Sequence, residues 1–299
     1  MDTHTGNIKA AVPKIGLALG GGGARGLAHV GVLKVLDREG IPISHVAGTS
    51  MGGIIGAMFA AGLPVSEIEK AALGLRKPLK QISLIDFNLI GKGLLRGTRL
   101  YRWLASYLGQ ELTFADLHIP LAMMAVDLNS GREVVLWQGK VVDAIRATIS
   151  VPGVFEPVKR DDLLLADGGI LNNVPVDTVR NLGAQAVIAV DVLPSFTANL
   201  PGQPPAVHPL KTPFLTQTLQ DVNHAFMLMI SEITACRLRH APPDIIIRPP
   251  LPADTHLFIG FDRPAELIAV GEAATEQALP QIRALLAQSG NSQETGAKT

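Results

Sequence analysis

The pentapeptide Gly48-Thr49-Ser50-Met51-Gly52 places a serine between two glycines with the spacing G-x-S-x-G. Such a serine becomes a nucleophile when it lies on a sharp turn between a strand and a helix, because that turn exposes its hydroxyl. Here an apolar segment at 46–49 precedes the serine, and a helical pattern of small residues at 51–61 follows it. The start of that helix would supply free N–H groups near the reacting oxygen. An ordinary tight turn is the alternative, but this context favours nucleophilic attack by Ser50.

A second motif, Gly20-Gly21-Gly22-Gly23-Ala24-Arg25-Gly26, lies between an apolar strand and a helical pattern. Consecutive glycines leave backbone N–H groups uncovered, so that they can face an anion. Gly21, Gly23 and Gly26 also satisfy the G-x-G-x-x-G spacing of a dinucleotide site, which needs an acidic residue at the end of the second strand. That strand ends in Ala47-Gly48-Thr49-Ser50, without an acid. We therefore favour an oxyanion hole, in which each N–H donor contributes about 100- to 1000-fold in rate.

A serine nucleophile also needs a base. A Ser-His-Asp triad would place its histidine after the serine, where the sequence has His208, His224, His240 and His256. None of these histidines lies in a glycine-marked turn, and Ser50 comes early for a fold that builds several strands before its nucleophile. We therefore expect these histidines to be ordinary surface or core residues.

Asp167 is the alternative base. It follows an apolar strand at 163–166 and precedes Gly168 and Gly169, which predicts a position at the edge of the sheet where α/β proteins bind ligands. A carboxylate is a weak base in water, and burial would raise its pKa toward a useful value. An Asp-Gly turn alone would explain these residues equally well. Together with the other two motifs, they complete a set of nucleophile, base and oxyanion donors.

Strand and helix patterns alternate along the chain. The expected strands are 14–20, 46–49, 121–128, 133–137, 163–166, 186–192 and 244–247. The expected helices are 29–39, 51–61, 66–75, 98–108, 141–149, 176–182, 218–239 and 264–287. This alternation predicts an α/β fold: a three-layer sandwich in which helices cover both faces of a mainly parallel sheet.

The sequence predicts one domain at 13–288, preceded by a flexible leader at 1–12 and followed by a disordered polar tail at 289–299. Within the domain, 193–215 is rich in proline, and we expect a long loop, which is typical of lids and binding loops. The uncharged stretch at 41–66 is long enough to cross a membrane. Its prolines and glycines instead favour a buried strand, turn and helix.

Composition narrows the class of protein. The chain has 299 residues, of which 47% are hydrophobic and 17% charged, enough to build a sizeable core. The formal net charge is +0, which argues against nucleic acid as a partner. The single cysteine, Cys236, excludes an intramolecular disulfide, and no secretory signal is evident. We therefore expect a cytoplasmic protein, with or without peripheral membrane contact.

Three motifs stand in order: GGGARG at 21–26, GTSMG at 48–52 and DGG at 167–169. Together they resemble the patatin-like phospholipase family, specifically its bacterial single-domain members related to the catalytic domain of neuropathy target esterase. The resemblance covers roughly residues 14–285. Further segments that agree are AHVGVLKVLDREGI at 28–41, SVPGVFEPV at 150–158 and DGGILNNVP at 167–175.

The resemblance implies a Ser-Asp dyad, with Ser50 as the nucleophile and Asp167 as the proton acceptor. It implies an oxyanion hole formed by Gly21, Gly22 and Gly23, with Arg25 holding either this loop or the anionic intermediate. Five more glycines would support the motifs: Gly26, Gly48, Gly52, Gly168 and Gly169. No cofactor or metal is expected, because no ligand cluster has zinc-site spacing and no EF-hand pattern is present.

The resemblance further implies hydrolysis of carboxylic esters in lipids or lysophospholipids through an acyl-enzyme. The apolar stretches at 82–95 and 193–215 would form an acyl groove, touch a bilayer or merely cover the core. Two other functions stay open. An acyltransferase of the malonyl-transfer type also uses G-x-S-x-G, but it needs a histidine base. A non-catalytic regulatory protein with the same pocket would not react with a fluorophosphonate probe.

Overall fold

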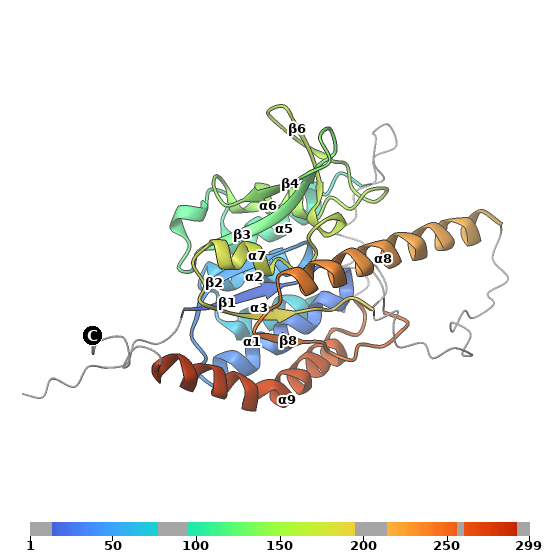
Figure 1. Cartoon of the computed structure of the whole chain (residues 1–299). Helices are drawn as coiled ribbons and strands as arrows, with labels where there is room; N and C mark the ends of the chain where they lie inside the picture. Colours follow the sequence, from blue (N-terminus) through green and yellow to red (C-terminus); the bar gives the residue numbers. More distant parts are fainter. Residues whose placement is uncertain (1–13, 77–94, 195–213, 256–259, 292–299) are drawn as a thin grey trace, which may run out of the picture.

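The structure is a computed structural model (Figure 1), and it describes residues 14–76, 95–194, 214–255 and 260–291. The expected leader at 1–12, nearly all of the stretch at 82–95 and most of the proline-rich segment at 193–215 lie outside the described residues. The described strands are β1 (Ile15–Leu19), β2 (Ile43–Gly48), β3 (Leu121–Asp127), β4 (Arg132–Leu136), β5 (Val158–Arg160), β6 (Leu163–Asp167), β7 (Ala186–Val190) and β8 (Ile245–Ile247). The α-helices are α1 (Ala28–Arg38), α2 (Met51–Ala60), α3 (Val65–Gly74), α5 (Thr98–Leu108), α6 (Val141–Thr148), α7 (Val176–Asn181), α8 (Phe214–His240) and α9 (Pro264–Asn291).

These strands form a single sheet in the order β5-β6-β3-β2-β1-β7-β8, with β4 also paired to β3. The pairs β3–β2, β2–β1, β1–β7 and β7–β8 are parallel, whereas β4, β5 and β6 are joined by antiparallel pairs. The predicted mainly parallel sheet is therefore confirmed, with an antiparallel portion at one end.

Alternating side chains along the central strands separate two hydrophobic cores. Leu17 and Leu19 of β1 belong to the larger core, together with residues of α1, α2, α6 and α9. Ala18, between them, faces the smaller core, where Val176 and Val179 of α7 and Leu238 of α8 pack. Because successive side chains of a strand point to opposite faces, helices cover the sheet on both sides, as the predicted three-layer sandwich requires.

On the face of the sheet that carries the smaller core, small residues allow α7 to pack closely. A Cβ atom at Gly16 of β1 would lie 2.7 Å from a methyl of Val179.

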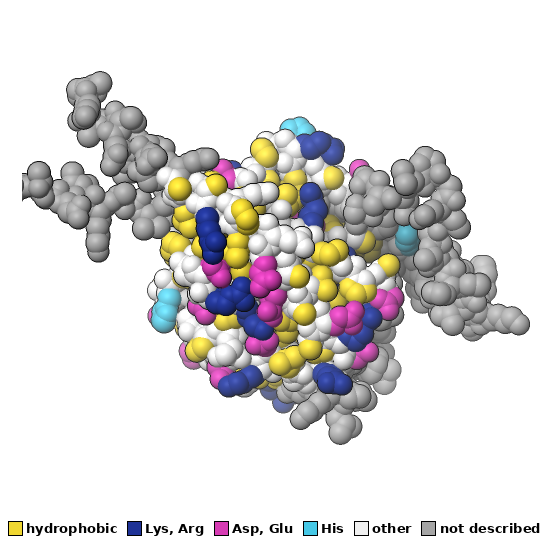
Figure 2. Space-filling model, turned by 90° about the horizontal axis from the view of Figure 1, so that it is seen from below, with side chains coloured by type: hydrophobic (Ala, Val, Ile, Leu, Met, Phe, Trp, Pro, Cys, Tyr) yellow, Lys and Arg dark blue, Asp and Glu magenta, His cyan; other side chains and the backbone are white. Residues whose placement is uncertain are grey.

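On the face that carries the larger core, α9 lies against α1 (Figure 1). Seen from this side, basic and acidic side chains are interspersed on the surface (Figure 2), and ion pairs such as Arg38–Glu276 at 2.9 Å join the two helices.

Some boundaries differ from the sequence prediction. Helix α9 extends to Asn291, beyond the expected start of the tail at 289, and α8 begins at Phe214, inside the expected loop. Strand β5 was not expected, because its three residues show no apolar alternation. The uncharged stretch at 41–66 forms a strand, a turn and helices. Among the described helices, none is long and apolar enough to cross a membrane.

Candidate active site

Ser50 lies on a strained turn between β2 and α2. Its backbone has φ 52° and ψ −121°, a conformation that costs free energy for any residue with a side chain. The Ser50 N–H donates a hydrogen bond of 3.0 Å to the hydroxyl of Thr148. That hydroxyl in turn donates to the Met124 carbonyl at 2.5 Å. The turn is thus fixed by groups from α6 and β3, which explains how the strain persists.

The glycines around Ser50 allow the turn to close onto β1. A Cβ atom at Gly48 would lie 2.5 Å from the Gly52 carbonyl oxygen, and one at Gly52 would lie 2.2 Å from the Leu19 carbonyl oxygen. Real Cβ atoms do not approach backbone oxygens this closely. The G-x-S-x-G spacing therefore reflects contact between two backbones. Gly26 serves a similar purpose, because a Cβ there would lie 2.6 Å from the Met51 Cβ.

Asp167 is the last residue of β6, and only 5% of its surface is exposed. One carboxylate oxygen accepts a hydrogen bond of 2.8 Å from the Gly169 N–H. Burial raises the pKa of Asp167 to about 6, and interactions with the Ser50 hydroxyl and the Gly169 N–H limit this rise. A carboxylate with this pKa is a stronger base than a solvated one, while it is still ionised at neutral pH.

Asp167 is carried to the site by an antiparallel strand, β6. The sequence predicted a mainly parallel sheet without giving the direction of this strand, and β6 runs antiparallel to β3. It overlaps only the last residues of β3, with Asp167 opposite Ala125. Its end therefore lies near the ends of β1 and β2, where the serine turn begins. Gly168 allows this approach, because a Cβ there would lie 2.4 Å from backbone atoms of Met124.

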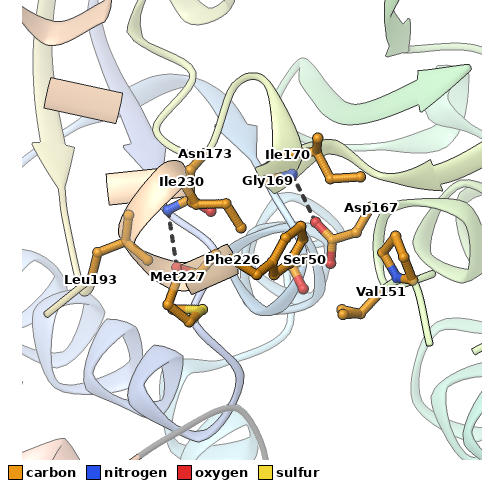
Figure 3. A pocket seen from close by; sticks show the side chains of 13 residues that line it. Ser50, Val151, Asp167, Gly169, Ile170, Asn173, Leu193, Phe226, Met227 and Ile230 are labelled. Carbon is orange, nitrogen blue, oxygen red and sulfur yellow. Dashed lines mark hydrogen bonds between the residues drawn. The ribbon is translucent and has the colours of Figure 1, made fainter. Parts of the chain in front are cut away.

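The glycine loop is held to the segment before α7 by Asn173. The Gly21 N–H donates to the Asn173 carbonyl at 3.2 Å, and the Asn173 side-chain amide donates to the Gly21 carbonyl at 3.1 Å (Figure 3). The Gly21 N–H is therefore already used. Within the described part of the chain, the N–H groups of Gly22 and Gly23 have no hydrogen-bond acceptor, so these two are the candidate oxyanion donors.

Arg25 is not among the residues that line the pocket beside Ser50. Its side chain is buried and donates to the carbonyl oxygens of Val192 at 2.5 Å and of Pro252 and Thr255, both at 3.2 Å. Burial lowers the pKa of Arg25 to about 10, so the guanidinium stays charged at neutral pH. Of the two roles that the resemblance implied, these contacts favour support of the loop over contact with the intermediate.

A pocket open to solvent joins the serine, the aspartate and the glycine loop. Its polar and backbone lining comes from Gly21, Gly22, Ser50, Asp167, Gly169 and Asn173. Its apolar lining comes from Val151, Pro152, Ile170, Leu193, Phe226, Met227 and Ile230. Figure 3 shows Ser50 between Asp167 on one side and Leu193, Met227 and Ile230 on the other.

Three residues near the site were not singled out from the sequence. Asn173 and Thr148 hold the glycine loop and the serine turn, as described above, and His29 supports the end of β1. The His29 Nε2–H donates to the Gly20 carbonyl at 2.7 Å, and burial lowers the pKa of this histidine to about 4. Asn173 and His29 carried a signal, because they lie in the segments DGGILNNVP and AHVGVLKVLDREGI, whereas Thr148 lies in none of the segments that agree with the family.

The histidines considered for a triad do not reach this pocket where the structure describes them. His224 and His240 lie on α8 and are not among the residues that line it. His208 and His256 lie outside the described residues. His29, although close in sequence to the glycine loop, is fully buried and does not line the pocket either. Asp167 is thus the candidate base among the described lining residues.

Comparison with known proteins gives relatives that match 60% of this chain. The sequence is 37% identical over 180 residues to an uncharacterised NTE family protein of Mycobacterium bovis, which covers 60% of this chain and 49% of that protein. It is 34% identical over 182 residues to human patatin-like phospholipase domain-containing protein 6, covering 60% of this chain and 13% of that protein. The chain therefore matches half or less of the length of these relatives.

The fold is also similar to that of VipD from Legionella pneumophila, with a TM-score of 0.50 and 12% identity over 91% of this chain and 67% of that one. At this identity, the similarity concerns the fold alone. A family model for patatin-like phospholipases matches residues 17–180, which is more than half of the chain and contains all three motifs. The chain belongs to the patatin-like phospholipase family.

Proposed function

We propose that this protein is a serine acyl hydrolase that cleaves carboxylic esters of lipids through a dyad of Ser50 and Asp167. The observation that carries the proposal is that a serine on a strained turn and a buried aspartate with a raised pKa line one pocket. Membership of the patatin-like phospholipase family supports a lipid ester as the substrate. So does the similarity to relatives such as the neuropathy target esterase of Drosophila melanogaster, at 32% identity.

The first half of the reaction forms an acyl-enzyme. The Asp167 carboxylate accepts the proton of the Ser50 hydroxyl as the serine oxygen bonds to the ester carbon. The carbonyl electrons move to the carbonyl oxygen, where the N–H groups of Gly22 and Gly23 stabilise the negative charge. The intermediate then collapses, and the bond to the alcohol oxygen breaks. Asp167 returns its proton to that oxygen, and the alcohol leaves.

The second half hydrolyses the acyl-enzyme. Asp167 accepts a proton from water, whose oxygen bonds to the acyl carbon, and the same N–H groups stabilise the new oxyanion. Collapse breaks the bond to the serine oxygen, which takes the proton back from Asp167. The fatty acid is released and the dyad is restored. Every step uses groups of the chain, the ester and water, so the proposal includes no metal or cofactor.

Ester hydrolysis by purified variants tests this proposal. Ser50→Ala and Asp167→Asn are each expected to lower kcat/KM for lysophospholipids and p-nitrophenyl esters by at least about 1000-fold, because each removes a member of one catalytic unit. Ser106→Ala and Asp37→Asn are matched controls, since both residues are exposed and lie outside the pocket. Activity retained in Ser50→Ala or Asp167→Asn would contradict the dyad.

A cytoplasmic location and peripheral contact with a lipid surface are part of the same proposal. The single cysteine, which is exposed and unpaired, fits a reducing compartment. Sedimentation of the wild-type protein with phospholipid vesicles tests the contact. Protein in the vesicle pellet supports it, and protein that stays in the supernatant at every vesicle concentration contradicts it.

A further inference from the structure

One wall of the pocket comes from parts of the chain beyond the family match at 17–180. Leu193 follows β7, whereas Phe226, Met227 and Ile230 lie on α8. Residues spaced in this way lie on one face of a helix. Every side chain of this wall is apolar, and the wall contains no group that could transfer a proton. Its chemistry therefore matches hydrocarbon rather than a polar head group.

The C-terminal half of α8 is fixed to the body of the protein. Arg237 forms ion pairs with Glu133 of β4 and, at 2.6 Å, with Asp177 of α7. Ile230 and Leu238 are buried, and the Ser231 hydroxyl donates to the Pro194 carbonyl at 3.4 Å. The helix therefore presents its pocket face from a defined position.

The proposed chemistry distinguishes the two sides of Ser50. Asp167 must return its proton to the alcohol oxygen, so the alcohol has to leave on the side where Asp167 lies. Val151 is on this side (Figure 3). The acyl chain is the other substituent of the ester carbon and extends away from the alcohol. On that side lie Leu193, Met227 and Ile230 (Figure 3).

We propose that Leu193, Phe226, Met227 and Ile230 form the acyl-chain subsite, and that α8 thereby sets the chain length that this enzyme prefers. The inference rests on the proposed ester hydrolysis and adds the place of the hydrocarbon. It assigns substrate selection to a helix outside the part of the chain that the family model matches. It also predicts that acyl-chain and alcohol preferences can be changed separately.

Two methionines on α8 provide a matched pair of variants. Met227 lines the pocket, whereas Met229 is 61% exposed and does not. Met227→Trp fills the subsite and is expected to lower the ratio of kcat/KM for octanoyl over acetyl p-nitrophenyl esters by about tenfold or more, the usual effect of a changed hydrophobic contact. Met229→Trp is expected to leave that ratio unchanged. A second series of acetyl esters varies the alcohol. Neither variant should change the ranking of these esters by kcat/KM.

Equal octanoyl-to-acetyl ratios in the two variants would overturn the subsite. So would a change confined to the alcohol series, because it would place the alcohol against α8. Binding of the fluorescent fatty acid cis-parinaric acid gives a readout that needs no catalysis. Met227→Trp should weaken this binding about tenfold relative to Met229→Trp. If the wild-type protein hydrolyses no ester, the proposed function fails, and this binding comparison still decides the subsite.

Discussion

At the scale of single residues, Ser50 and Asp167 each lower the unfolding free energy of the protein. Ser50 adopts a backbone conformation that side chains disfavour, and Asp167 holds a carboxylate away from water. Local costs of this kind gather at functional sites, where the surrounding structure compensates for them. Here the compensation comes from a few hydrogen bonds, such as those that the Ser50 N–H donates to the Thr148 hydroxyl and the Gly169 N–H donates to Asp167.

The pH dependence of activity follows from the raised pKa of Asp167. Only its ionised form accepts the serine proton, so kcat/KM should rise with pH and level off above about 6, the pKa to which burial brings this carboxyl. Initial rates with an uncharged short-chain ester measure the profile. A profile that is flat from about pH 5 to 8 would contradict Asp167 as the base, because its protonation would then have no effect.

The same burial predicts that Asp167→Asn stabilises the protein. The folded-state pKa lies above that of an unfolded aspartate, so the folded state holds the extra proton between about pH 4 and 6, and its stability falls as pH rises through this window. Asparagine carries no charge and avoids that loss. At about pH 7 the variant should gain up to about 3 kcal/mol in unfolding free energy.

Denaturant unfolding of wild type and Asp167→Asn at two pH values checks this gain. It should shrink when the pH is lowered below about 4, because the wild-type carboxyl is then protonated in both states. A variant that is less stable than wild type at neutral pH would show that the surroundings stabilise the Asp167 carboxylate. That result would contradict a pKa raised by burial.

At the scale of helices and strands, the packing of α1 against α9 depends on two glycines. A Cβ atom at Gly31 would lie 2.0 Å from the Ile268 carbonyl oxygen, and one at Gly271 would lie 2.0 Å from that of Ala28. The backbones of the two helices therefore touch at both positions. Since backbone atoms cannot rotate away, a side chain at either glycine must push the helices apart.

Gly271→Ala is accordingly expected to lower the unfolding free energy by about 2 kcal/mol, because the cost of overpacking exceeds the gain in helix propensity. Gly74→Ala is the matched control. Gly74 ends α3, and among the described residues no heavy atom beyond its chain neighbours and its own helix backbone lies within 4 Å of the position of its Cβ. That variant should gain about 0.5–1 kcal/mol. Thermal or denaturant unfolding measures both, and equal effects would refute the contact.

Prediction from the sequence worked for features that are local in the chain. The serine turn and the glycine loop each lie within a few residues, and α5 was expected at its observed limits, 98–108. The contacts that complete the site are not local. Asn173 bonds to Gly21 across 152 positions and Thr148 to Ser50 across 98. No periodicity encodes such pairs, so Asn173 and Thr148 were not singled out, and the antiparallel direction of β6 was not foreseen.

At the scale of the whole molecule, the chain beyond the family match completes the structure. The larger core includes residues from Ile15 of β1 to Ile282 of α9. Helix α9 covers α1, and α8 supplies a wall of the pocket. We therefore propose that 13–288 forms one domain, as expected from the sequence, although the family match ends at residue 180.

A single domain predicts one cooperative unfolding transition. The core shared by β1 and α9 should be lost at one step, since neither end of the chain can bury its apolar side chains alone. Far-ultraviolet circular dichroism and tryptophan fluorescence, which reports on α5 and the end of β4 through Trp103 and Trp137, should give the same midpoint. Two separate midpoints would indicate two units.

The central claim is that Ser50 is activated by Asp167, and the rate of covalent labelling by a fluorophosphonate probe tests it most directly. Mass spectrometry should locate the probe on Ser50. The labelling rate should rise as the pH passes about 6, the pKa of Asp167, and fall at least about 100-fold in Asp167→Asn. Labelling of another residue, or an undiminished rate at Ser50 in Asp167→Asn, would contradict the account.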